Sequence, residues 1–379
     1  MIEDIPDSFG GEFGGAFRGK RVLVTGHTGF KGPWLCEWLL ALGADVTGLA
    51  LAPTGEARLF DSFNLVKRVR HLTGDIRDFA VVRKAIKESA PDFIFHLAAQ
   101  SLVRASYREP VETYATNVMG TVHMLEAVRQ IGRPCVVIAV TSDKCYENTE
   151  SGRDYREDDP LGGYDPYSSS KGATELVVAA YARSYFSAVD SPVRLASARA
   201  GNVIGGGDGA TDRLVPDCIR ALQRGKPMLV RNKEATRPWQ HVLEPLAGYL
   251  LLAAELHQNP ALFTPGPVAF NFGPGVGSTR TVRELVEEIL LHWPGQWVDG
   301  SDPKAPHEAK LLGLDIAKAA RVLGWRPVWD FATAIGNTVD WYKRQTGQPV
   351  FDAAAVTRGQ IAAYVAAARA QGLSWTSSE

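Results

Sequence analysis

Short apolar runs rich in β-branched residues alternate with amphipathic segments through the first half of the chain. Four of these runs are apolar along nearly their whole length, namely RVLVTG at 21–26, ADVTGLAL at 44–51, DFIFHLAA at 92–99 and CVVIAVTS at 135–142. Such runs are typical of parallel strands that are covered on both faces. The segments between them, such as PWLCEWLLALG and VHMLEAVRQIG, have apolar residues at helical spacing. The alternation predicts an α/β fold with a doubly wound parallel sheet.

The pattern changes after about residue 200. Segments such as AGNVIGGGDGA, RNKEATRPWQ and NPALFTPGPVAF bring glycine, proline and polar residues where the regular alternation had been. The stretch VLEPLAGYLLLAAELH at 242–257 is nevertheless apolar enough to pack back on the sheet. We therefore expect two interleaved domains, one formed by residues 1–200 with about 242–272, and a smaller one formed by 201–241 with 273–379.

The charge balance argues against polyanionic partners. The 379 residues include 41 Lys and Arg against 42 Asp and Glu, so the chain has no net attraction for nucleic acid or for an anionic membrane. Its start, MIEDIPDSFGGEFGG, does not resemble a secretory signal, and no apolar run approaches membrane-spanning length. We expect a cytoplasmic protein.

The cysteines give no sign of a metal site or a disulfide framework. Cys36, Cys135, Cys145 and Cys218 lie far apart and form no C-x-x-C pair, so we expect reduced thiols and no bound metal. Cys145 adjoins the candidate catalytic residues described below, so a reactive thiol is the alternative to a merely buried one.

A glycine motif follows the first predicted strand. The segment VLVTGHTGFKG at 22–32 runs from a strand through Gly26-x-x-Gly29-x-x-Gly32 into a helical pattern. In this setting the first glycine permits a tight turn, the second lets the backbone approach a pyrophosphate, and the third allows close packing of helix and strand. The motif predicts a Rossmann-type dinucleotide site.

The second strand does not decide between NAD and NADP. It ends LALAPTGEARLF, without the aspartate that usually binds the adenosine ribose, and the nearest acid is Glu56. Arg58 is available for a 2′-phosphate, although a solvated loop arginine is the simpler interpretation.

Two further groups of residues suggest acid–base chemistry. Tyr167 and Lys171 are four residues apart, so they share one face if their segment is helical. Lys171 and the positive charge of a nicotinamide would favour the phenolate that removes a proton from a hydroxyl group. Ser142, Asp143 and Lys144 end the fourth predicted strand, at the edge where α/β proteins bind ligands. The alternative for these three is a loop cap with a solvated lysine.

The glycine motif together with Tyr167 and Lys171 resembles the extended short-chain dehydrogenase/reductase family. Over about residues 20 to 345 the chain is similar to the nucleotide-sugar 4,6-dehydratases of that family, in TGHTGFKG, HLAAQSLVRASYREPVETYATNVMGT, TSDKCYEN, GGYDPYSSSKG, RAGNVIGGGD and RPWQHVLEPL. Where dTDP-glucose dehydratases have Thr-Asp-Glu, this chain has Ser142-Asp143-Lys144, which resembles the enzymes that act on CDP-sugars. The resemblance therefore implies CDP-glucose as the substrate.

The resemblance implies a reaction with no net redox change, in which NAD stays bound throughout. Tyr167 would be the base at the 4-hydroxyl while hydride leaves C4, and Asp143 would protonate the departing 6-hydroxyl as water is lost across C5 and C6. Lys144 would have to be neutral to act as the base at C5, or it would instead stabilise an enolate. The hydride returns to C6, which gives the 4-keto-6-deoxy sugar used in deoxysugar biosynthesis.

The resemblance also implies the residues that bind cofactor and substrate. Arginine suits a diphosphate because its planar fork donates two hydrogen bonds. The implied cofactor contacts are Gly26, Thr28, Gly29, Phe30, Lys31, Gly32, Asp75, Ile76, Leu97, Ala98, Ala99, Tyr167 and Lys171. The implied substrate contacts are Gln100, Arg104, Asn202, Arg213, Arg231, Arg237, His241 and His307, with Glu308 as a weaker candidate.

Other interpretations share part of this pattern. A nucleotide-sugar 4-epimerase or reductase would need Tyr167 and Lys171 but no acid–base pair such as Asp143-Lys144. A dehydratase for another nucleotide sugar would need all of them, whereas a non-catalytic sensor would be expected to lose Tyr167 or Lys171. Family members are commonly dimers, so the resemblance implies a homodimer or a dimer of dimers. The alanine-rich segment after about residue 345 receives no assignment.

Overall fold

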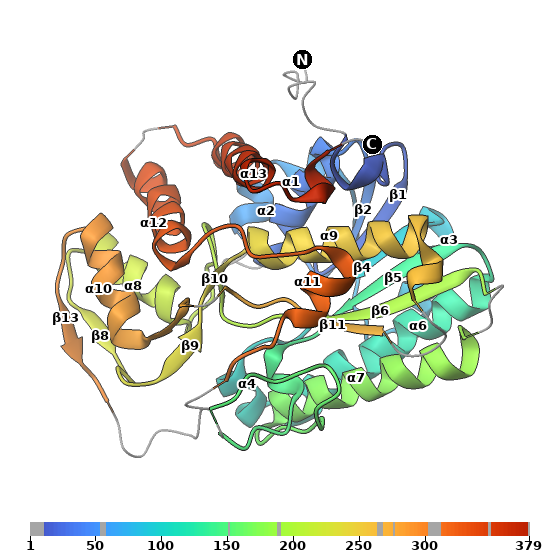
Figure 1. The fold of residues 1–379 in the computed structure, drawn as a ribbon, viewed down its shortest axis with the longest axis horizontal. Coiled ribbons are helices and arrows are strands. Elements are labelled where there is room, and N and C mark those ends of the chain that lie inside the picture. Colours follow the sequence, from blue (N-terminus) through green and yellow to red (C-terminus); the bar gives the residue numbers. More distant parts are fainter. Residues whose placement is uncertain are drawn as a thin grey trace.

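A seven-stranded parallel sheet forms the centre of the protein (Figure 1). The computed structural model describes residues 11–53, 58–150, 152–187, 191–263, 268–275, 277–301, 312–347 and 350–377. In spatial order the strands are β11 (Val268–Asn271), β6 (Val193–Arg199), β5 (Cys135–Val140), β4 (Phe93–His96), β1 (Arg21–Thr25), β2 (Asp45–Ala50) and β3 (Arg70–Thr73). The direction in which the strands are added reverses between β1 and β4, which opens a crevice at their carboxyl ends. The predicted α/β fold with a doubly wound parallel sheet is confirmed.

The four strands predicted from apolar runs all form, but each is one to four residues shorter than its run. The last residues of each run leave the sheet to build the loops above its carboxyl edge. Within the strands the side chains alternate between two cores, since Val22 and Val24 belong to one and Leu23 to the other. Both faces are therefore buried, as the continuous apolar runs predicted.

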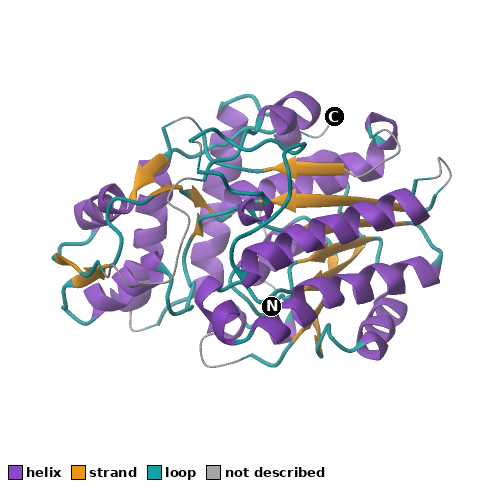
Figure 2. Cartoon of the chain, turned by 90° about the horizontal axis from the view of Figure 1, so that it is seen from below, coloured by secondary structure: helices purple, strands orange, loops and turns teal. Residues whose placement is uncertain are grey.

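Different helices cover the two faces of the sheet (Figure 2). The core on one face includes residues of α1 (Lys31–Ala41), α9 (Leu243–Gln258), α12 (Phe331–Gly347) and α13 (Ala353–Ala370). The core on the other face includes residues of α3 (Phe79–Ser89), α6 (Gly120–Ile131) and α7 (Pro166–Tyr185). Shorter helices on the loops are α2 (Arg58–Ser62), α4 (Val103–Arg108) and α5 (Pro110–Tyr114).

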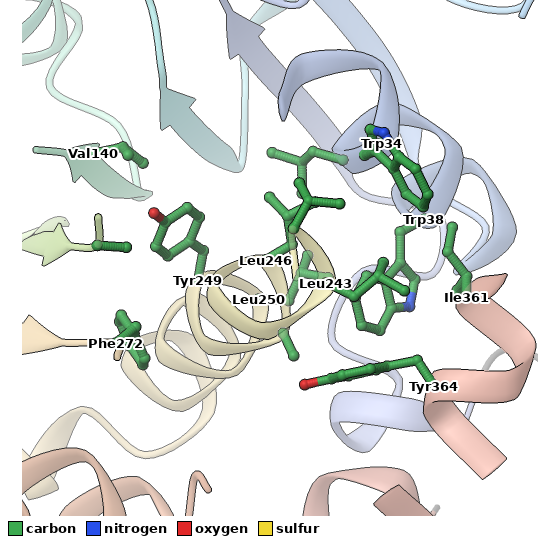
Figure 3. Close-up of a cluster of buried hydrophobic side chains, with 14 of the residues drawn as sticks. Trp34, Trp38, Val140, Leu243, Leu246, Tyr249, Leu250, Phe272, Ile361 and Tyr364 are labelled. Carbon is green, nitrogen blue, oxygen red and sulfur yellow. The ribbon is translucent and has the colours of Figure 1, made fainter. Parts of the chain in front are cut away.

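Helix α9 is the apolar segment that the sequence placed against the sheet. Leu243, Leu246 and Leu250 are completely buried, and Figure 3 shows them between Trp38 on one side and Val140 on the other. A helix that is apolar on all sides is stable only where its whole circumference is covered. Neither α9 nor any other helix in the described ranges has both the length and the apolarity needed to cross a bilayer.

Several segments after β6, apart from α9, β11 and α13, form a smaller unit beside the sheet, to the left in Figure 1. Three short strand pairs run through it, namely β7 (Val203–Ile204) with β10 (Gln240–His241), β9 (Thr236–Pro238) with β12 (Thr279–Thr281), and β8 (Met228–Val230) with β13 (Trp297–Asp299). Its other helices are α8 (Leu214–Gln223) and α10 (Val282–His292), whereas α11 (Ala317–Leu323) packs on β11 and α9 at the edge of the sheet. This unit faces the carboxyl edge of the sheet and so helps to enclose the crevice.

The segment after residue 345, which the sequence left unassigned, packs on the first helix of the chain. Trp38 of α1 meets Tyr364 of α13 edge to face, with ring centroids 5.9 Å apart. Phe13 and Trp375 stack at 4.9 Å, which brings the two ends of the described chain together, as Figure 1 shows. The C-terminal helix therefore completes the core beneath the glycine motif.

A buried carboxylate joins three parts of this region. Glu244, at the start of α9, accepts hydrogen bonds from the backbone N–H groups of Val328 and Trp329 at 3.0 and 2.7 Å and from the Tyr364 hydroxyl at 2.7 Å. Burial raises the pKa of Glu244 to about 7, although these donors oppose the shift. The link between α9, the loop before α12, and α13 thus depends on a titratable group.

Candidate active site

A large cavity lies at the carboxyl edge of the sheet, between the loops after β1, β2, β4 and β5 and the smaller unit. Its volume is about 1290 Å³, above the roughly 300–1,000 Å³ that is usual for one small ligand. The position agrees with the rule that α/β sheets bind ligands where the strand order reverses. The cavity has room for more than one small molecule.

The glycine motif forms a cradle on one wall of this cavity. A Cβ atom at Gly32 would lie 2.4 Å from the Cα of His27, so only glycine lets α1 start this close to β1. Gly26 has a φ of +72°, and a Cβ there would lie 2.8 Å from the Cα of Ala98. At Gly29 the only neighbour within 4 Å among the described residues would be the carbonyl oxygen of Gly26, at 3.3 Å. The cradle is thus closed beneath and open above, as a bound pyrophosphate requires.

The residues expected to bind the cofactor lie together around the cradle. All of them line the cavity: Gly26, Thr28, Gly29, Phe30, Lys31, Gly32, Asp75, Ile76, Leu97, Ala98, Ala99, Tyr167 and Lys171. Asp75 accepts hydrogen bonds from the backbone N–H and the guanidinium of Arg77, which lower the pKa of its carboxyl group. Of the residues considered for the ribose end, Glu56 and the side chain of Arg58 lie outside the described part of the chain.

His27, inside the glycine motif, has a structural role that no local pattern in the sequence indicates. Its ring fills the space beside Gly48 of β2, where a Cβ atom would come within 2.3 Å of it. Nε2 of His27 lies 2.7 Å from Nδ1 of His71, and burial lowers the pKa of His27 to about 3. The histidine is therefore neutral and packs beneath the cradle.

Asp143 is held in a defined orientation at the end of β5. Its carboxylate is completely buried and accepts hydrogen bonds from the Ser142 hydroxyl at 2.7 Å and from Nδ2 of Asn202 at 3.2 Å. The ammonium of Lys144 lies 3.7 Å from the same carboxylate. Gly201 makes room for it, since a Cβ atom there would lie 2.0 Å from Cγ of Asp143. This arrangement can supply an acid and a base at one point of the cavity.

Tyr167 and Lys171 lie in the first turns of α7, which begins at a cap formed by Asp165. Burial raises the pKa of Tyr167 to about 12, although a hydrogen bond with Ser142 works in the other direction. Lys171 donates to the carbonyl oxygen of Val140 at 3.3 Å, and burial lowers its pKa to about 8. The sequence predicted a phenol that ionises easily, but in the chain by itself desolvation is the larger effect. A phenolate here requires additional positive charge.

Lys31 brings a further amine to the same side of the cavity. Its Nζ atom donates to the hydroxyl of Tyr249 in α9 at 3.4 Å. Burial, with the charge of Arg213 next in importance, lowers the pKa of Lys31 to about 7. Lys31 is among the residues expected from the sequence and Tyr249 is not, because no local pattern places a residue of α9 beside the glycine motif.

The smaller unit supplies guanidinium groups to the opposite wall. Arg213 donates to Asp208 and to the hydroxyl of Ser101, both at 2.9 Å. Arg231 donates to Asp212 at 3.0 Å. These contacts orient the guanidinium planes, which suits recognition of a diphosphate. The expected substrate residues that line the cavity are Arg104, Asn202, Arg213, Arg231 and Arg237.

Three of the residues expected to bind substrate are not placed in the cavity wall. The amide of Gln100 instead holds its own loop, donating to Leu102 and to Thr113. His241 is buried between Trp34 and Trp329, with its pKa lowered to about 3. His307, like Glu308, lies outside the described residues. For Gln100 and His241 the structure therefore favours a structural role.

The cysteines are all buried and unpaired. Burial raises the pKa of Cys145 well above its usual range, and Glu175 adds to the shift. The alternative of a reactive thiol at Cys145 is wrong, because the nucleophilic form of cysteine is the thiolate. Among the described residues, no group of three or more His, Cys, Asp and Glu side chains could hold a metal ion.

Comparison with known proteins places this site in a family. The family model described as GDP-mannose 4,6 dehydratase matches residues 23–338. The chain is 48% identical to the CDP-glucose 4,6-dehydratase of Salmonella typhimurium, over 86% of this chain and 91% of that protein.

Two solved structures have the same architecture. The UDP-glucose 4-epimerase of Thermus thermophilus, in complex with NAD, aligns with a TM-score of 0.73 and 26% identity over 85% of this chain and 99% of that one. The dTDP-glucose 4,6-dehydratase DesIV of Streptomyces venezuelae, also with NAD bound, aligns with a TM-score of 0.72 and 28% identity over 86% and 98%. The chain therefore belongs to the GDP-mannose 4,6-dehydratase family of nucleotide-sugar enzymes, within the short-chain dehydrogenases/reductases.

Proposed function

We propose that this protein is a CDP-glucose 4,6-dehydratase that converts CDP-D-glucose to CDP-4-keto-6-deoxy-D-glucose with tightly held NAD. The observation that carries the proposal is the buried carboxyl group of Asp143, fixed by Ser142 and Asn202 on the cavity wall. An enzyme that only inverts or reduces C4 needs Tyr167 and Lys171 but no such second acid–base group. The 48% identity to the Salmonella enzyme supports CDP-glucose over other nucleotide sugars.

The side chains divide the reaction between them. When bound, NAD supplies the chemistry of hydride removal from C4 and hydride return to C6, and its positive ring favours the phenolate. Tyr167 takes the proton of the 4-hydroxyl, while Ser142 hydrogen-bonds the same oxygen and Lys171 stabilises the phenolate. The 4-ketone then acidifies the proton on C5, so oxidation precedes loss of water.

The elimination uses the pair at the end of β5. In its protonated form Asp143 gives its proton to the departing 6-hydroxyl group, and the carboxyl group is completely buried. Lys144, 3.7 Å away, takes the C5 proton as a neutral amine or stabilises the enolate as an ammonium. The identity of this base is separate from the proposal that a dehydration occurs.

The assignment of cofactor binding and substrate binding to separate domains stays a prediction. We propose that residues 1–200 with about 242–272 hold NAD, and that 201–241 with 273–379 hold the nucleotide sugar. The arginines on the wall formed by the smaller unit support the second part. The helix α13 departs from this division, because it packs on α1 of the part proposed to hold NAD.

We propose that the protein acts as a homodimer or a dimer of dimers. Apolar side chains stay exposed on neighbouring helices, with Val111 of α5 at 82% and Leu176 of α7 at 60% of full exposure. Exposed apolar side chains on adjacent helices support the proposal, because interfaces between subunits bury such residues. Sedimentation of the purified protein measures the assembly directly.

The proposal is tested by proton NMR of the purified protein in deuterated water with no added reductant. CDP-glucose is compared with dTDP-, UDP- and GDP-glucose, and the methyl signal at C6 is the readout. A 4-keto-6-deoxy product with deuterium at C5 from CDP-glucose alone supports every part of the proposal, provided that label placed at C4 moves to C6.

The other outcomes separate the parts of the proposal. If a nucleotide sugar with a nucleobase other than cytosine is the preferred substrate, only the assignment of CDP-glucose is overturned. Inversion or reduction at C4 with no methyl signal would mean that Asp143 and Lys144 have no part in a dehydration, and that the enzyme is an epimerase or reductase. Tyr167→Phe is the control, since its activity must be lost with every nucleotide sugar.

A further inference from the structure

We propose that Glu175 is a positioning residue for this reaction, which keeps Lys171 charged behind Tyr167 by closing a buried network with Arg199. The inference rests on the proposed function, because it takes Tyr167 to be the base. Glu175 does not line the cavity, so it acts only through its neighbours.

Glu175 and Lys171 are bound to consecutive residues at the end of β5. They lie one turn apart on α7, and they are 3% and 5% exposed. Nζ of Lys171 donates to the carbonyl oxygen of Val140 at 3.3 Å, and the hydroxyl of the next residue, Thr141, donates to Oε1 of Glu175. The strand end that leads into Ser142 therefore fixes both charged groups.

The second oxygen of Glu175 belongs to an ion pair with β6. Oε2 accepts from Nη2 of Arg199 at 2.7 Å and from the hydroxyl of Ser197 at 2.7 Å. Arg199 is buried as well, and its Nη1 atom donates to the Tyr146 hydroxyl at 2.7 Å. Although burial alone would favour the neutral acid, Arg199 lowers the pKa of Glu175, so the carboxylate is ionised.

The groups that face Lys171 come from four elements. Burial disfavours its charge, and Glu175 and Cys145 are the groups that favour it. Cys145 has a strongly raised pKa and stays a neutral thiol, and His96, whose pKa is lowered to about 3, is neutral too. Lys31 faces Lys171 from α1 and disfavours a second positive charge. Among these groups, Glu175 is thus the anion that keeps Lys171 an ammonium.

Tyr167 lies one turn before Lys171 on the same face of α7, and the charged groups that act on its phenol oppose one another. Asp143 and Asp165 raise the pKa of the phenol, whereas Arg213 lowers it. Loss of an oppositely charged partner shifts the pKa of a buried group by about one to three units. If Lys171 becomes neutral, the phenolate loses a cation and forms only at higher pH.

The central experiment compares Glu175→Gln with the unchanged enzyme in two assays. The first is the pH dependence of kcat/KM for CDP-glucose, where we expect the acid limb to move up by about one unit or more. The second is NMR titration of ¹³Cζ-tyrosine in the NAD-loaded protein without substrate, with Tyr167 assigned by its absence from Tyr167→Phe. We expect the Tyr167 signal to titrate at higher pH by a similar amount.

Two further variants separate charge from structure. Glu37→Gln is the matched control, because Glu37 is another completely buried carboxylate paired with arginines, Arg68 and Arg358, but it lies in α1 outside the cavity wall. The double variant Glu175→Gln with Arg199→Met removes both charges of the pair and avoids a lone buried arginine. It is expected to keep the upward shift, and it decides the question if the single variant does not fold.

The outcomes distinguish this inference from the proposed function. An unchanged acid limb and an unchanged Tyr167 titration in folded Glu175→Gln overturn the inference, as does an equal shift in Glu37→Gln. Absence of dehydratase activity in the unchanged protein refutes the proposed function instead, and the tyrosine titration then still reports whether Glu175 controls Tyr167.

Discussion

Replacing Glu244 by glutamine should make the protein more stable at pH 8 but not at pH 5. The carboxyl group is completely buried and is bonded to two backbone N–H groups and to the Tyr364 hydroxyl. Its pKa is raised to about 7 in the folded protein. A protonated glutamate and a glutamine can keep both backbone contacts, since Oε1 accepts from the N–H groups of Val328 and Trp329 at 3.2 and 2.7 Å. The second polar atom then donates to the Tyr364 hydroxyl instead of accepting from it.

The size of the effect follows from the shift in pKa. The pKa rises from 4.5 to about 7, and each unit corresponds to about 1.4 kcal/mol, which gives about 3 kcal/mol. Between these two pH values the folded protein holds a proton that the unfolded chain has released, so stability falls as the pH rises. The contribution is fully present below pH 4.5 and is lost as the pH passes 7.

Urea unfolding followed by tryptophan fluorescence measures this difference across pH 5 to 8. We expect Glu244→Gln to match the unchanged protein at pH 5 and to exceed it by about 3 kcal/mol at pH 8. Comparing the two proteins cancels the titration of every other group. Tyr364→Phe is a second variant for the same unfolding assay, because it removes one hydrogen bond to Glu244 and leaves the carboxyl group buried. A glutamine variant that is less stable than the unchanged protein at pH 8 would refute the reasoning.

Two other substitutions have clear expected outcomes. Gly32→Ala should weaken NAD binding about tenfold or more, because the new Cβ atom would lie 2.4 Å from the Cα of His27 and force α1 away from the cradle. Calorimetric titration with NAD measures this, and Gly359→Ala, with open space around it in α13, should bind NAD normally. Asp143→Asn should lower kcat by about 10²–10⁴-fold with little change in KM, as proton transfer is lost; near-normal formation of the C6 methyl group would contradict that role.

The parts of the site that the sequence predicted are those encoded within a few residues. The turn at Gly26, the tight approach at Gly32 and the shared helix face of Tyr167 and Lys171 each follow from local spacing. The position of Ser142 at the carboxyl edge follows from the end of an apolar run. Glu175 lies four residues after Lys171, so the same helical spacing places it on the face shared by Tyr167 and Lys171.

The parts that escaped prediction depend on contacts between distant segments. His241 lies in the two-residue strand β10, and only the pairing of that strand with β7 turns its ring towards Trp34 instead of the cavity. Tyr249 and Arg199 come from α9 and β6. The sequence patterns of these two elements predict only that they are buried, not that they lie beside the site. The raised pKa of Tyr167 also depends on the enclosure of the whole site, which no spacing in the sequence reveals.

The contact of α13 with α1 has a consequence for how the protein is made. A ribosome releases the glycine motif and Trp38 early, but the rings that cover Trp38, those of Tyr364 and Trp375, belong to a segment that is synthesised much later. The first βα unit thus stays without its outer layer until α13 has been made. Dinucleotide affinity should appear only once α13 is present, and nascent chains halted before residue 353 should bind chaperones through the uncovered flank of α1.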